Sequence, residues 1–79
     1  MEFSKAVQLE PNSENYIQLG ETQEALGNHE TAILDFNEAL KLDPDNPQLY
    51  FARAGAERAL GKVKPANFDF RYGRYLETR

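Results

Sequence analysis

The sequence predicts an all-α protein, a short α-solenoid of antiparallel helix-turn-helix hairpins with about five helices. Two stretches carry apolar residues at the helical period, one from Ser13 and one from His29, and Gly27-Asn28 separates them. The segment Asp43-Pro44-Asp45-Asn46 ends the second stretch, because proline cannot continue a helix. The same pattern then recurs from Pro47 onward, which is typical of a helical repeat.

The central unit, residues 12–46, carries aromatic, apolar and small residues at fixed intervals, namely Tyr16, Leu19, Gly20, Ala32, Phe36 and Pro44. This spacing resembles the tetratricopeptide repeat (TPR), a unit of roughly 34 residues with an aromatic, Leu-Gly, Ala, Phe and Pro in this order. Gln23 stands where the family usually has tyrosine. The resemblance implies a protein-binding scaffold.

Local signals place the ends of the helices within this unit. Asn12 or Ser13 is expected to cap the first helix, because such side chains accept hydrogen bonds from free backbone amides. Gly20 inside the helix costs about 1 kcal/mol relative to alanine, so we expect another backbone to come close to it in a tightly packed hairpin. Gly27 favours the left-handed conformation that ends a helix. The second helix is therefore expected to run from about His29 to Leu42.

Partial copies of the unit flank it on both sides. Residues 1–11 repeat the Phe, Ala and Pro intervals of the second helix, so they are interpreted as a half repeat whose first helix is missing. The alternative is a frayed, tag-like N-terminus. Residues 47–79 repeat the full unit 34 residues later in degenerate form. The chain is thus interpreted as one domain made of a half repeat, a full repeat and a degenerate repeat.

Three substitutions make the last repeat degenerate. Arg53 replaces the equivalent of Leu19, a core position, so we expect the site to be peripheral, with the guanidinium at the edge. Pro65 suggests that the last helix begins near Lys64. Gly73 replaces the equivalent of Ala39 and is expected to weaken the middle of that helix.

Composition narrows the classes of function. The chain has 79 residues, no cysteine and no apolar run near the roughly 20 residues that a membrane span needs, so a cytoplasmic protein without a membrane partner is expected. Residues 1–61 carry eleven acidic against four basic side chains, whereas residues 62–79 carry two against five. An acidic body with a basic end can attract copies of itself.

Enzymatic chemistry finds little support in the sequence. His29 is the only histidine and is interpreted as a packing residue, because no nucleophile accompanies it. The glycines are too dispersed for a phosphate-binding loop, and Asp43-Pro44-Asp45-Asn46 lacks the spacing of a calcium loop. We therefore predict no enzyme, no catalytic residue, no cofactor and no metal.

The resemblance implies a concave groove lined by the first helix of each repeat. The predicted peptide-binding residues share the helix side away from Tyr16 and Leu19, and they are Glu14, Ile17, Glu21, Glu24, Gln48, Phe51 and Arg58. They predict binding of a basic or apolar segment of a partner protein, with Ile17 and Phe51 as apolar contacts. Members of the family that clamp a carboxylate use Lys and Asn there, so Ile17 and Glu21 argue against that ligand. A solvated acidic face is the alternative.

The last helix predicts a second surface. Phe68, Tyr72, Tyr75 and Leu76 recur at helical spacing and exceed what one hairpin is expected to cover. We therefore expect a moderately weak homodimer, or a structural role in a longer repeat array, as the alternative function. Basic and aromatic residues together are also typical of single-stranded nucleic-acid binding. The acidic remainder of the chain favours packing and self-association, so no nucleic-acid partner is expected.

Overall fold

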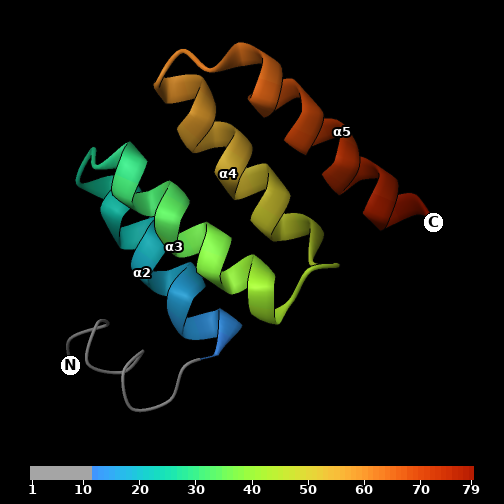
Figure 1. Cartoon of the computed structure of the whole chain (residues 1–79), viewed down its shortest axis with the longest axis horizontal. Coiled ribbons are helices and arrows are strands. Elements are labelled where there is room, and N and C mark those ends of the chain that lie inside the picture. Colours follow the sequence, from blue (N-terminus) through green and yellow to red (C-terminus); the bar gives the residue numbers. More distant parts are fainter. Residues whose placement is uncertain (1–11) are drawn as a thin grey trace.

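Four α-helices follow one another in the computed structural model, which describes residues 12–79 (Figure 1). They are α2 (Ser13–Ala25), α3 (His29–Leu42), α4 (Pro47–Ala59) and α5 (Val63–Thr78). Each helix packs on the next along the chain, and α2 also touches α4. The predicted all-α class of helical hairpins is confirmed. The expected half repeat at residues 1–11, which would supply a fifth helix, lies outside the described residues.

The helix ends follow from local chemistry. The Asn12 side chain accepts a hydrogen bond of 2.9 Å from the backbone amide of Asn15, which caps the start of α2 as expected. The Asn46 side chain caps α4 in the same way, by accepting from the amide of Gln48 at 3.0 Å. Gly27 and Gly61 have φ values of 82° and 79°, and this left-handed conformation ends α2 and α4.

The last helix begins one residue earlier than the sequence suggested. It starts at Val63, not at Lys64, and Pro65 lies in its first turn. The first four amides of a helix have no intrahelical acceptor, so the missing N–H of Pro65 costs no hydrogen bond there. Proline therefore did not delay the helix.

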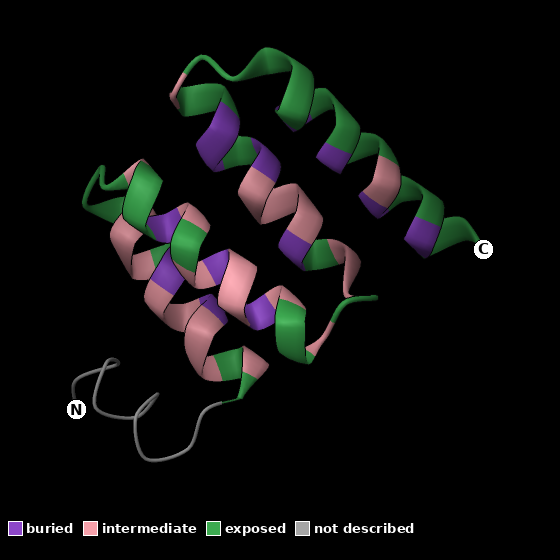
Figure 2. Ribbon diagram, viewed as in Figure 1, coloured by how far each residue is buried: buried purple, intermediate pink, exposed green. Residues whose placement is uncertain are grey.

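The core lies between the first hairpin and α4. Phe36 has only 1% of its surface exposed and belongs to a cluster with Ile17, Ala32, Ala39 and Leu49. Figure 2 shows buried positions along each of these helices. A Cβ added to Gly20 would lie 2.5 Å from the Phe36 ring. The expected close approach of another backbone at Gly20 is corrected, because the side-chain ring of Phe36 occupies the space.

In the second hairpin, two equivalent packing positions carry side chains of different size from those in the first. Ile17 and Ala39 of the first hairpin correspond to Phe51 and Gly73 of the second. A Cβ on Gly73 would lie 2.8 Å from the Phe51 ring, so the glycine provides the room that the larger aromatic needs. Gly73 was expected only to weaken α5. The structure gives a reason for the glycine, because a larger residue there would collide with the Phe51 ring.

Candidate interaction surfaces

Acidic side chains mark the exposed side of α2. Glu14 and Glu21 are exposed, and α2 contains no lysine or arginine. Their equivalents one repeat later, Gln48 and Gly55 on α4, are exposed as well. Because α2 touches α4 and equivalent positions of two repeats have the same orientation, we expect these residues to share one side of the protein, and we call this predicted surface the groove face.

Two further predicted groove residues lie at the edge of this face. Arg58 is exposed on the last turn of α4. Glu24 is half-buried, and its Oε1 lies 2.5 Å from Nδ1 of His29 at the start of α3. His29 therefore binds a carboxylate across the turn, whereas the sequence analysis interpreted it as a packing residue. Glu24 is less free than Glu14 or Glu21 to bind a ligand.

The two predicted apolar contacts of the groove are largely used inside the protein. Ile17 is 5% exposed and is part of the core cluster, so its assignment to an open groove is corrected. Phe51 is half-buried, with its ring centroid 5.5 Å from that of Phe70 on α5. Both side chains lean towards the second helix of their own hairpin, which simple helical periodicity does not reveal.

A stripe of three aromatic rings runs along the outside of α5. Phe68 and Tyr75 are 65% and 56% exposed, and Tyr72 lies between them with ring centroids at 6.2 Å and 5.9 Å. Tyr72 also meets Tyr50 of α4 edge-on, at 4.8 Å between centroids. We call Phe68, Tyr72 and Tyr75 the aromatic stripe. Leu76, predicted to join it, is 8% exposed and faces the interior, so that assignment is corrected.

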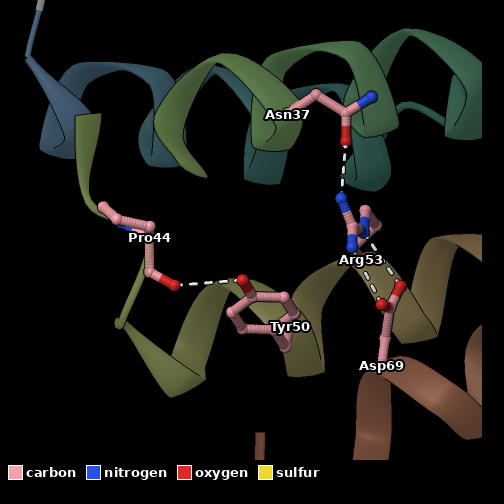
Figure 3. Close-up of polar contacts among 5 residues, drawn as sticks. All are labelled: Asn37, Pro44, Tyr50, Arg53 and Asp69. Carbon is pink, nitrogen blue, oxygen red and sulfur yellow. Dashed lines mark hydrogen bonds and ion pairs between the residues drawn. The ribbon is translucent and has the colours of Figure 1, made fainter. Parts of the chain in front are cut away.

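A polar cluster that the sequence reading missed connects three helices (Figure 3). Arg53 of α4 donates two hydrogen bonds of 2.8 Å to the two carboxylate oxygens of Asp69 on α5. It donates a third, of 2.9 Å, to the side-chain oxygen of Asn37 on α3. The expectation that Arg53 lies at the edge is corrected, because its side chain is 22% exposed and its partner Asp69 is buried.

Glu57 completes this cluster one turn along α4. Its side chain is buried, and its Oε1 has no hydrogen-bond partner in the described part of the chain. Burial, with a contribution from neighbouring Asp69, raises the pKa of Glu57 to about 7. Burial also acts to raise the pKa of Asp69, but hydrogen bonds from Arg53 and Glu57 outweigh it and hold that pKa below its usual value.

The described residues were also compared with the requirements of a metal site and of a membrane-spanning helix. Within residues 12–79, no three His, Asp or Glu side chains are arranged to hold a metal ion. None of the helices in that range is long and apolar enough to cross a membrane. What the range offers is an acidic groove face, an aromatic stripe and the polar cluster beneath α5.

Comparison with protein families agrees with the geometry. Residues 25–61 match the family model described as TPR repeat, a stretch that runs from the end of α2 to the turn after α4. Residues 25–61 therefore carry the features of a tetratricopeptide repeat. The resemblance noted in the sequence is thereby confirmed, and TPR repeats generally mediate protein–protein interactions and are typically non-enzymatic. A search among curated proteins finds none that matches the chain.

Proposed function

We propose that this TPR chain is an interaction module that binds a basic segment of a partner protein on its groove face. The single observation that carries the proposal is the pair of exposed carboxylates, Glu14 and Glu21, on a helix without any basic residue. Burial of Ile17 removes one of the two apolar contacts, so charge is the stronger basis for recognition. Of the two expected ligands, basic and apolar, the geometry favours the basic one.

Long-range attraction is the physical basis of this preference. Exposed charges attract over about 10 Å at 0.1 M salt, so a basic peptide is drawn to α2 and the attraction weakens as salt rises. Gln48 and Gly55 line the neighbouring part of the face without opposing charge. A Cβ placed on Gly55 would meet nothing within 4 Å, so a peptide backbone can approach α4 there.

The binding test compares charge-reversed variants. Glu21→Lys is expected to weaken binding of a fluorescent Lys/Arg-rich peptide by at least about 1.4- to 5-fold, since exposed charge pairs contribute roughly 0.2–1 kcal/mol each. Glu30→Lys, a change at another exposed glutamate on α3, is the matched control and should leave the affinity closer to that of the wild type. Fluorescence anisotropy at two salt concentrations measures both. If an acidic peptide of the same length binds the wild type as tightly as the Lys/Arg-rich peptide, the proposal is contradicted.

The aromatic stripe supports a second candidate function, self-association. Phe68 and Tyr75 expose large apolar surfaces side by side with Tyr72, and such patches seek partners. The face of α5 that would receive a further repeat is more polar, because the position of Leu40 in α3 is Arg74 in α5. A two-fold pair that covers the stripe is therefore favoured over head-to-tail stacking.

Sedimentation equilibrium tests this second candidate. At several hundred micromolar we expect a mass above that of the monomer, because the exposed rings are then covered. Tyr75→Glu places a charge in the stripe and should restore the monomer. Glu77→Gln, a change at an exposed residue of α5 outside the stripe, should not. A monomeric mass for the wild type at low and high salt would exclude the dimer.

A further inference from the structure

The polar cluster between α4 and α5 contains one more acid than base. Arg53 is its cation, and Glu57 and Asp69, with 9% and 2% of their surfaces exposed, are its two carboxyl groups. Arg53 already occupies both oxygens of Asp69. If both acids were ionised, the cluster would hold an uncompensated negative charge out of water, which is costly.

A single proton resolves this imbalance. When Glu57 is protonated, its hydroxyl can donate to Asp69, the cluster is electrically neutral, and Arg53 keeps its two hydrogen bonds. When the proton leaves to solvent, two buried carboxylates face each other with one guanidinium between α4 and α5. Oε1 of Glu57 has no hydrogen-bond partner in residues 12–79, so no described hydrogen bond stabilises a negative charge on that oxygen.

We propose that Glu57, Asp69 and Arg53 form a pH-sensitive latch, in which a proton held by the two carboxyl groups keeps α5 on α4 and its loss loosens α5. The latch is independent of the groove face. It concerns the helix that carries the aromatic stripe, so it would alter how firmly that stripe is presented.

The groups that face Glu57 set the pH at which the latch opens. Asp69 from α5 disfavours its ionisation, while Arg53 on α4 and Lys62 at the start of α5 favour it. From α3 the cluster receives the neutral amide of Asn37. Burial has the largest effect, and the outcome is a pKa of about 7 for Glu57 against an ordinary value of 4.5.

The sign of the pH dependence follows from linkage. Between the pKa of the unfolded chain, near 4.5, and that of the folded chain, about 7, the folded state binds more protons than the unfolded state. Stability contributed by Glu57 is therefore complete below pH 4.5 and is lost as the pH rises through 7. This is opposite to the usual carboxylate, which stabilises the fold as it ionises.

Urea unfolding of the full chain, followed by circular dichroism from pH 5 to 8, tests the latch. We expect the folding equilibrium constant to fall with rising pH, by at most about tenfold per pH unit between pH 5 and 6.5, and to level off above pH 7.5. Glu57→Gln keeps a donor for Asp69 but cannot ionise, so this decline should largely disappear. All other ionisable groups are present in both proteins, so their contributions cancel in the comparison.

Two further measurements keep the test decisive. Glu30→Gln, an exposed control, should decline with pH as the wild type does. Carbon-13 NMR of the Glu57 carboxyl in the wild type needs no variant, and its midpoint should lie near 7. Protection factors from hydrogen exchange should drop in α5 before α2 and α3. A Glu57 midpoint near 4.5, or an equal decline in Glu57→Gln, would overturn the latch.

Discussion

Replacing Phe36 by alanine is expected to leave the chain largely unfolded at 25 °C. Phe36 is 1% exposed and fills the space above Gly20, where no Cβ fits. Truncating a buried aromatic costs about 3–5 kcal/mol, because both the transfer free energy and the contacts around the cavity are lost. A domain of this size has little more stability than that in total. The helical circular dichroism signal at 222 nm should therefore fall strongly.

Leu34 provides the matched control for this prediction. It lies on the same helix but is 64% exposed, so Leu34→Ala should change stability by no more than about 0.5 kcal/mol. A Phe36→Ala protein that keeps the helicity and urea midpoint of the wild type would show that the core lies elsewhere.

The second large effect is expected for Arg53→Met, which removes the cation of the polar cluster. Methionine can fill much of the volume of the arginine stem, but Asp69 and Glu57 would then remain buried without a positive partner. Breaking a buried ion pair from one side costs about 3–5 kcal/mol. The urea midpoint should therefore drop sharply, and more so at pH 8 than at pH 5, because fewer protons are then available to neutralise the two acids.

Two comparisons separate the lost ion pair from lost packing. Removing both partners in Arg53→Met/Asp69→Leu should recover much of the stability, because the double variant no longer buries the Asp69 carboxylate without its cation. Arg58→Met, an exposed arginine on the same helix, should change little. If Arg53→Met is as stable as Arg58→Met, the cluster does not stabilise the fold.

Helix ends could be predicted because each depends on a few adjacent residues. Asn12, Gly27 and Pro44 act through capping, a left-handed turn and a missing amide, and all three act as expected. The fold class followed from the same signals repeated along the chain. Pro65 was misjudged because it falls within the first turn, a position that depends on where the helix starts.

Which way each helix faces could be predicted only in part. Periodicity separates two sides of α2, but a rotation of about one residue decides whether Ile17 is open or buried, and the packing of α3 and α4 sets that rotation. Leu76 was misplaced in the same way. The carboxylates of Glu14 and Glu21 are exposed, as expected for acidic side chains outside a core.

The polar cluster was beyond the sequence reading because its partners are far apart along the chain. Arg53 and Asp69 are 16 residues apart, on different helices, so no local spacing rule relates them. One signal was available: Arg53 stands at a core position, and a buried charge requires a partner. Asking which acid one helix further along could reach it would have pointed to α5.

Mapping a bound basic peptide by NMR tests the proposed function most directly. Titrating a Lys/Arg-rich peptide into the isotope-labelled chain, we expect the largest amide shifts at Glu14 and Glu21 on α2 and at Gln48 and Gly55 on α4, and smaller shifts at 0.5 M salt. An acidic peptide of equal length should cause none. Shifts confined to α5, or equal responses to both peptides, would contradict binding on the groove face.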